Sequence, residues 1–229
     1  MSPARPLHVI YGGTFDPVHR GHTGIARAAR AALLDAGLSI QAFDFLPNAD
    51  PPHRAAPGAT AGHRVAMLWL ALADESGVGI DLRELRRGGA SYMVDTLAEL
   101  RGELGPDTPL VLLLGEDAWR GFDRWQRWQE IPQLAHLLVV DRPHADIAAA
   151  SPALEALMEA RSRPLARLAD SPAGGLCKLG LPPEPASATE VRVAVAQGDA
   201  RAIEAYLEPT VAAYIARHGL YGQRASGTT

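Results

Sequence analysis

The sequence contains a single cysteine, Cys177, among its 229 residues. One thiol excludes an internal disulfide framework and any metal cluster held by several cysteines. No apolar run approaches the roughly 20 residues that a membrane-spanning helix needs, and the start of the chain lacks the pattern of a signal peptide. These absences predict a protein of the reducing cytoplasm with no membrane partner.

The sequence is also short of positive charge and of lysine. It holds 22 basic residues against 26 acidic ones, for a net charge of -4, and Lys178 is its one lysine. A general nucleic-acid binder needs a basic face, so we expect no nucleic-acid partner. Arginine supplies nearly all of the positive charge and suits bidentate contact with phosphate groups.

Two common nucleotide-binding motifs are missing. The chain has no Gly-x-x-x-x-Gly-Lys-Ser/Thr run, and no Gly-x-Gly-x-x-Gly follows its first apolar stretch. The first absence excludes a P-loop NTPase, and the second excludes a standard dinucleotide-dependent dehydrogenase.

Short apolar runs alternate with longer amphipathic segments, an order that predicts βαβ units. We therefore expect one α/β domain over residues 1–229, with a mostly parallel central sheet and helices on both faces. Residues 145–175 show little periodicity and are expected to form a variable connection. Strands are expected at Leu7–Tyr11, Ile40–Leu46, Val78–Leu82, Leu110–Leu114, Leu134–Val140 and Leu176–Leu179, and helices at Thr23–Ala36, Ala61–Ala73, Ser91–Leu104, Ala188–Gln197 and Pro209–His218, with a helical or irregular stretch over Glu116–Pro132.

The most informative run is Gly-Gly-Thr-Phe-Asp-Pro-Val-His-Arg-Gly-His, at residues 12–22. It joins the first expected strand to the first expected helix, where glycines and free backbone N–H groups can hold a phosphate. His19 and His22, three residues apart, can reach the same phosphate group. Taken singly, the glycine pair is an ordinary turn, and the histidines are a surface pair or half of a metal site.

A second candidate anion site begins at Ser187, in the run Ser-Ala-Thr-Glu-Val-Arg of residues 187–192. On its spacing alone, this run is a capped helix start with an exposed Arg192. Beside the first run, it also suits a phosphate, because hydroxyls, helix N–H groups and a guanidinium would converge.

The first run resembles the GxFDPxHxGH signature of the nucleotidyltransferase superfamily, and the second resembles that superfamily's Ser-x-Thr-x-x-Arg motif, although Ala186 stands where isoleucine is common. The resemblance implies a Rossmann-like nucleotidyltransferase fold in which a C-terminal helical part, at about residues 187–222, completes an ATP site. It implies catalytic roles for His19, His22 and Arg192. The implied ATP-binding residues are Gly12, Gly13, Thr14, Phe15, His19, His22, Gly115, Asp117, Ser187, Thr189 and Arg192.

Further runs from Val9 to Tyr221 resemble bacterial nicotinate-nucleotide adenylyltransferases. These runs are Pro47–Arg54, Arg83–Leu85, Ser91–Tyr92, Leu114–Asp117, Trp125, Arg142–Pro143 and His218–Tyr221. Each has a plainer interpretation, such as an inert loop, a core tryptophan or a helix cap, and the order of the whole set favours the enzyme. Met93 departs from a common threonine, which leaves the shape of the pyridine pocket open. The implied substrate-binding residues are Asp16, Asn48, His53, Arg54, Tyr92, Met93, Trp125 and Gln126.

The resemblance implies transfer of an adenylyl group from ATP to nicotinate mononucleotide, with Mg²⁺ bound mainly through the ATP phosphates and few protein ligands. No nucleophile motif is present, and none is needed, because the attacking phosphate oxygen is already anionic. Nicotinamide mononucleotide and pantetheine phosphate remain alternative acceptors. A non-catalytic nucleotide-binding regulator and a metal-dependent hydrolase are the alternatives from other classes. The chain is expected to act as a monomer or a homodimer.

Overall fold

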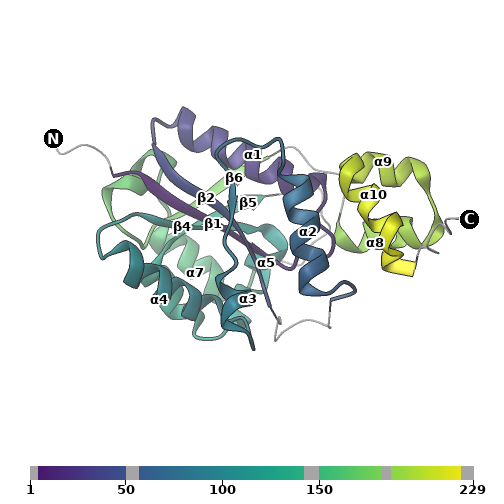
Figure 1. Ribbon diagram of the computed structural model, residues 1–229. Coiled ribbons are helices and arrows are strands. Elements are labelled where there is room, and N and C mark those ends of the chain that lie inside the picture. Colours follow the sequence, from purple (N-terminus) through teal and green to yellow (C-terminus); the bar gives the residue numbers. More distant parts are fainter. Residues whose placement is uncertain (1–4, 50–56, 142–149, 182–186, 223–229) are drawn as a thin grey trace, which may run out of the picture.

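The computed structural model describes residues 5–49, 57–141, 150–181 and 187–222. Its centre is a six-stranded sheet with the order β3-β2-β1-β4-β5-β6, in which all neighbouring strands are parallel (Figure 1). The expected parallel α/β architecture is therefore confirmed. The strands are β1 (Leu7–Gly13), β2 (Ile40–Pro47), β3 (Gly79–Ile80), β4 (Leu110–Gly115), β5 (His136–Asp141) and β6 (Leu176–Gly180).

Helices cover both faces of this sheet. The α-helices are α1 (Arg20–Asp35), α2 (Ala61–Ala71), α3 (Arg83–Arg87), α4 (Met93–Leu104), α5 (Glu116–Arg120), α6 (Ile131–Leu134), α7 (Pro152–Arg161), α8 (Ala188–Gln197), α9 (Ala200–Tyr206) and α10 (Pro209–His218). Short 3-10 helices lie at η1 (Phe122–Arg124), η2 (Trp128–Glu130), η3 (Leu165–Asp170) and η4 (Leu220–Gly222). None of these helices is long and apolar enough to cross a membrane.

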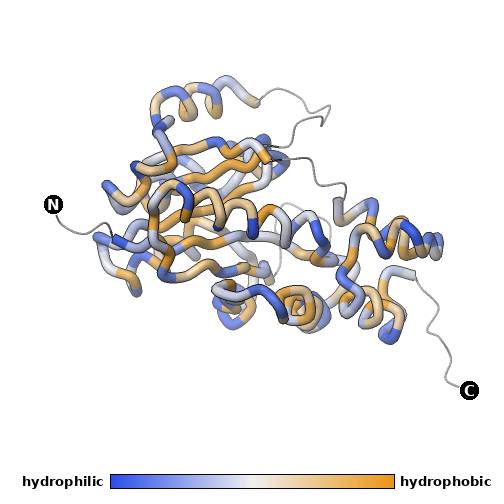
Figure 2. The backbone as a smooth tube through the Cα atoms, turned by 90° about the horizontal axis from the view of Figure 1, so that it is seen from above, coloured by the Kyte–Doolittle hydropathy of each residue, from blue (hydrophilic) through white to orange (hydrophobic). Residues whose placement is uncertain are grey.

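Alternate residues of the central strands enter two separate hydrophobic clusters. Val111 and Leu113 of β4 pack in the cluster that holds α1, α2 and the C-terminal helices, whereas Leu112 and Leu114 pack with α4, α5 and α7. A parallel strand covered on both faces reads as an unbroken apolar run, which is why β4 has the sequence Leu-Val-Leu-Leu-Leu. Figure 2 shows hydrophobic stretches of the backbone running through the middle of the molecule.

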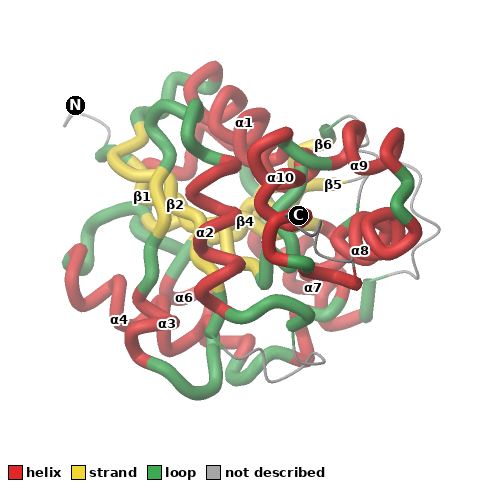
Figure 3. Tube along the Cα trace, turned by 45° about the vertical axis from the view of Figure 1, so that its right-hand side comes forward, coloured by secondary structure: helices red, strands yellow, loops and turns green. Residues whose placement is uncertain are grey.

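The C-terminal helices α8, α9 and α10 group together at one end of the molecule (Figures 1 and 3). Within this group, α8 packs on α9, and α10 contacts α2. Buried Val191, Val195 and Ile215 join this group to the same core as α1 and α2. Residues remote in sequence are thus brought to the carboxyl edge of the sheet.

Several element boundaries differ from the expected ones. Helix α1 begins at Arg20 rather than Thr23, because His19 already acts as its N-cap. Strand β5 begins at His136 rather than Leu134, since residues 131–134 form α6 with proline in its first turn. The expected variable connection contains α7 and η3. The start of α7 carries a recognisable signal, because Ser151 caps it and Pro152 follows.

Candidate active site

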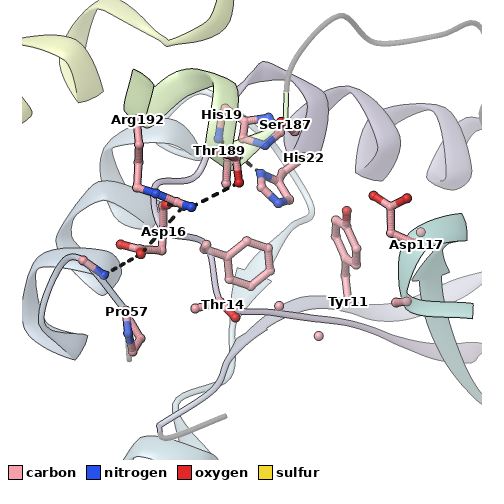
Figure 4. A pocket seen from close by; sticks show the side chains of 17 residues that line it. Tyr11, Thr14, Asp16, His19, His22, Pro57, Asp117, Ser187, Thr189 and Arg192 are labelled. Atoms are coloured by element: carbon pink, nitrogen blue, oxygen red, sulfur yellow. Dashed lines mark hydrogen bonds and ion pairs between the residues drawn. The ribbon is translucent and has the colours of Figure 1, made fainter. Parts of the chain in front are cut away.

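A cavity of about 580 Å³ opens at the carboxyl ends of β1 and β4. The strand order places β2 on one side of β1 and β4 on the other, so connections leave in opposite directions at this point. Such a switch point is the usual ligand crevice of an open parallel sheet. The lining residues are Tyr11, Gly12, Gly13, Thr14, Phe15, Asp16, His19, His22, Pro57, Gly58, Gly115, Asp117, Ala118, Ser187, Ala188, Thr189 and Arg192 (Figure 4).

The turn after β1 leaves no room for a side chain at Gly13. A Cβ placed there would lie 2.7 Å from the ring of Phe15. Phe15 itself has a positive φ of 51° and is buried, with its ring edge-on to those of Tyr11 and His22. Since a left-handed backbone is unfavourable for a bulky residue, the surrounding ring contacts must hold this conformation.

His19 and His22 lie together at the start of α1, with their ring centroids 3.8 Å apart. The backbone N–H of His19 donates to Nδ1 of His22 over 3.3 Å. A neutral His22 therefore carries its proton on Nε2. Both rings line the cavity beside the N–H groups of the first helical turn, where an anion is favoured.

The second anion element lines the same cavity. Ser187 caps α8 through a reciprocal pair of hydrogen bonds with Glu190. Arg192 donates from Nη2 to Thr189 Oγ1 at 3.1 Å and from Nη1 to the main-chain oxygen of Asp16 at 2.6 Å. The side chain of Arg192 thus joins two motifs that are 176 positions apart (Figure 4).

Asp16 lines the cavity, but protein donors engage both of its carboxylate oxygens. Oδ2 accepts the Gly58 N–H at 2.7 Å, and Oδ1 accepts the Ala59 N–H at 3.0 Å. The Tyr221 hydroxyl donates to the same Oδ1. These bonds tie the first motif to the segment before α2 and to the C-terminal turn, so the visible role of this carboxylate is architectural.

Asp117 stands on the opposite wall of the cavity, in the first turn of α5. Gly115 ends β4 and is the N-cap of that helix. A carboxylate in the first helical turn is favoured by the helix dipole and can accept hydrogen bonds from a sugar. Asp117 and Gly115, which are both expected to bind ATP, therefore line the same cavity as the two phosphate motifs.

Asp16 apart, the residues expected to bind the acceptor that the structure describes are not among those lining this cavity. Asn48 Nδ2 donates to Thr14 Oγ1 at 3.1 Å, and the Met93 methyl lies 2.7 Å from where a Cβ on Gly12 would be. Tyr92 is the N-cap of α4. Trp125 is half-buried against Phe122, and Gln126 is exposed. The remaining two, His53 and Arg54, lie outside the described residues, as do Arg142–Pro143 and Ala186.

Every residue expected to bind ATP lines the cavity, together with Asp16. Sequence reasoning missed five lining positions, namely Tyr11, Pro57, Gly58, Ala118 and Ala188. Three of these, Tyr11, Ala118 and Ala188, are direct neighbours of predicted residues in the sequence. Tyr11 carries a usable signal, because an inward-facing residue near the carboxyl end of a central strand borders the crevice.

Comparisons with known proteins agree with this geometry. A family model described as cytidylyltransferase-like matches residues 10–194. Over 222 residues, the chain is 46% identical to a protein of Xylella fastidiosa (strain M12) and 47% identical to one of Stenotrophomonas maltophilia (strain K279a), covering 94% of this chain and 96% of each relative. Both relatives carry the name probable nicotinate-nucleotide adenylyltransferase.

Among solved structures, Plasmodium falciparum nicotinic acid mononucleotide adenylyltransferase complexed with NaAD has the same fold, with a TM-score of 0.70 and 18% identity. The match covers 96% of this chain and 98% of that one. The two-motif cavity, the family model and the full-length relatives lead to one conclusion. The chain belongs to the nicotinate-nucleotide adenylyltransferase family.

Proposed function

We propose that the protein transfers the adenylyl group of ATP to nicotinate mononucleotide, giving deamido-NAD and pyrophosphate. The observation that carries this proposal is the convergence of two anion-binding helix starts, α1 and α8, on one cavity at the switch point of the sheet. The names of the full-length relatives supply the acceptor.

In this reaction, the 5′-phosphate oxygen of the acceptor attacks the α-phosphorus of ATP. A new P–O bond forms as the bond to the β-phosphate oxygen breaks, and the electron pair leaves with pyrophosphate. The attacking oxygen is already ionised near neutral pH, so the protein has only to position the reactants and stabilise charge. We assign His19 and His22 to the phosphates at the reacting centre, and Ser187, Thr189 and Arg192 to the departing pyrophosphate.

The remaining predicted residues divide between the two substrates. Gly12, Gly13, Thr14 and Phe15 form the phosphate turn, and Gly115 and Asp117 hold the nucleoside. Asn48, Tyr92, Met93, Trp125 and Gln126 lie toward the acceptor, where a tryptophan face suits a flat pyridine ring. Asp16 is also proposed to contact the substrate. Both of its carboxylate oxygens already accept hydrogen bonds from the protein.

The donor chemistry of the cavity fits a magnesium ion carried by ATP. Among the described residues, no three histidine, cysteine or acidic side chains group as a metal site. The cavity offers hydroxyls, histidines and an arginine, with Asp16 and Asp117 as its lining carboxylates. Mg²⁺ bound to nucleotide phosphates would neutralise charge on them while keeping most of its water ligands.

The test is pyrophosphate release from ATP and Mg²⁺, with nicotinate mononucleotide and its amide compared at equal concentrations. A clear preference for the acid is expected. Preference for the amide would overturn the acceptor while keeping the reaction. Release with pantetheine phosphate alone would overturn the acceptor class, and binding of ATP without release with any acceptor would favour a regulator.

A further inference from the structure

Arg64 is a buried arginine that has no role in the substrate and catalytic assignments made above. It lies on α2 and is 1% exposed. Its Nη1 donates to the carbonyl oxygen of Thr14 at 2.7 Å. Its Nη2 donates to the carbonyl oxygens of Asn48 at 2.8 Å and Ala49 at 3.2 Å. One guanidinium thus holds the loops that follow β1 and β2.

The charge of Arg64 is balanced by dipoles rather than by a partner ion. Within the described parts of the chain, Arg64 forms no ion pair with a carboxylate. Burial lowers the pKa of its guanidinium, and the more distant Asp16 and Tyr221 oppose this. A buried cation held by neutral acceptors is a poor source of stability compared with apolar packing. The hydrogen bonds from Arg64 instead fix the directions of three carbonyl groups.

Those directions also fix the N–H groups on the opposite side of each peptide. In a planar trans peptide, the C=O and the following N–H point in opposite directions. The Thr14 carbonyl points to Arg64, so the Phe15 N–H points away from it, at a turn where both residues line the cavity. The Asn48 carbonyl also points to Arg64, and the Ala49 N–H donates away from it to Ser91 Oγ at 2.9 Å.

The same contact bears on the strained residue of the phosphate turn. Phe15 has a φ of 51°, and the carbonyl that Arg64 holds belongs to the peptide immediately before it. A non-glycine residue in this region is unfavourable unless its surroundings hold it. Arg64 therefore restrains the peptide between Thr14 and Phe15, next to the residue with the unfavourable backbone conformation.

We propose that Arg64 is a positioning residue for both substrates. It holds the phosphate turn and the acceptor loop at one geometry, and so couples the ATP site to the mononucleotide site without touching either ligand. This inference rests on the proposed function, which places ATP against the loop after β1 and nicotinate mononucleotide against the loop after β2.

The chain offers a matched control in Arg101 on α4. Its guanidinium donates only to carbonyl oxygens, those of Gly105, Thr108, Leu134 and Pro172, which lie around the amino ends of β4, β5 and β6. Arg64→Lys and Arg101→Lys each keep the charge and lose the forked geometry that reaches two loops at once. Both variants should unfold at lower denaturant concentration than the wild type.

Only Arg64→Lys should change the kinetics. We expect kcat/KM to fall about ten- to a hundredfold, with a rise in KM for both ATP and nicotinate mononucleotide. The Kd of a non-hydrolysable ATP analogue, measured by calorimetry, should rise as well. Arg101→Lys should leave all of these constants within about twofold of the wild type, since surface and remote changes have small effects.

Unchanged KM values in a folded Arg64→Lys protein would overturn the proposal, and so would an effect confined to one substrate. Arg64→Gln, which removes the buried charge, serves as a second variant if the lysine form does not fold, and the same increases are expected. The analogue Kd separates this inference from the proposed function. A wild type that binds the analogue but makes no deamido-NAD would refute the function, while a changed Kd in the variant would still support positioning at the phosphate turn.

Discussion

The hydroxyl of Tyr221 donates a 2.7 Å hydrogen bond to Oδ1 of Asp16, across 205 positions of the chain. The Tyr221 ring also packs over Gly58, where an added Cβ would lie 3.2 Å from it. Burial first, and the neighbouring Asp16 carboxylate next, raise the pKa of Tyr221, so the hydroxyl stays protonated and donating. The C-terminal turn η4 is thereby fixed to the first motif, beside the carbonyl that Arg192 binds.

Tyr221→Phe should weaken both stability and ATP binding. Loss of the hydroxyl removes one hydrogen bond to a carboxylate, worth about 1–3 kcal/mol of unfolding free energy. Asp16 is then less firmly held, and with it Arg192, so the KM for ATP should rise several-fold. Denaturant unfolding and initial rates check this. Tyr214→Phe is the matched control, because its hydroxyl contacts His63 outside the cavity, and it should leave the ATP KM unchanged. If Tyr221→Phe and Tyr214→Phe had the same KM for ATP, the Tyr221 hydroxyl would not support ATP binding through Asp16 and Arg192.

Gly13→Ala should nearly abolish activity. The added methyl would lie 2.7 Å from the Phe15 ring. That ring is packed against Tyr11 and Phe45, which oppose its displacement. Gly102→Ala makes a useful comparison, because nothing lies within 4 Å of a Cβ at that helical position. It should stabilise the protein by up to about 1 kcal/mol, since alanine favours a helix. Retained activity in Gly13→Ala would show that the turn is less constrained than its contacts indicate.

Much of the fold and of the cavity lining follows from local sequence patterns. The apolar runs at β1, β4 and β5 predict buried parallel strands because both of their faces are covered. The lining residues within 12–22 and 187–192 were predictable as neighbours, because each group lies in a single turn or helix start. The acceptor residues were reached only through resemblance, and two of them, His53 and Arg54, lie outside the described structure.

The contacts that join these local pieces could not be read from the sequence. Arg64 sits in an ordinary amphipathic helix, and its three carbonyl partners come from loops up to 50 positions away. Asp16 belongs to a motif, yet its partners Gly58, Ala59 and Tyr221 have no pattern relating them to it. Long-range hydrogen bonds to backbone groups leave no periodic trace, because any residue can supply a carbonyl or an N–H.

His22→Ala should lower kcat far more than it changes the KM for ATP. Because Nδ1 accepts the His19 N–H, the neutral ring carries its proton on Nε2, and the ring lines the cavity in which we propose that the phosphates bind. An interaction that strengthens in the transition state appears in kcat rather than in KM. We expect a fall of about a hundredfold or more, as for other positioned donors. His63→Ala, in α2 and away from the lining residues, should keep kcat. A kcat equal to that of the wild type would remove His22 from catalysis.

Trp125→Ala should weaken nicotinate mononucleotide and leave ATP almost unaffected. The side chain is half-buried beside Phe122 and lies apart from the residues lining the ATP cavity. Loss of an aromatic face for the pyridine ring should raise the acceptor KM about tenfold, the equivalent of one stacking contact. Trp69→Ala is the control, since that tryptophan is 56% exposed on α2 and should affect neither KM. A change in ATP affinity alone would show that Trp125 is wrongly assigned.

His136 should make the fold sensitive to mild acid. It is fully buried at the start of β5, where Nε2 faces the carbonyl oxygen of Ser171 and Nδ1 accepts the Gly175 N–H, both at 2.8 Å. This pair of bonds fixes the neutral ring with its proton on Nε2. Burial lowers the pKa of His136 from 6.5 to about 4, and the positive charges of Arg163 and Arg101 act in the same direction.

Between pH 6.5 and 4 the unfolded chain therefore binds this proton and the folded chain does not, so stability falls as the pH falls. The contribution is complete above pH 6.5, and up to about 3 kcal/mol is lost by pH 4. Denaturant unfolding at pH 7, 5.5 and 4.5 should show a weaker pH dependence in His136→Gln than in the wild type. Burial raises the pKa of Asp44 and Glu84, which acts in the opposite direction, but both groups are present in each protein. Because their effects cancel in the difference, parallel stability curves for the two proteins would rule out His136 as the acid-sensitive group.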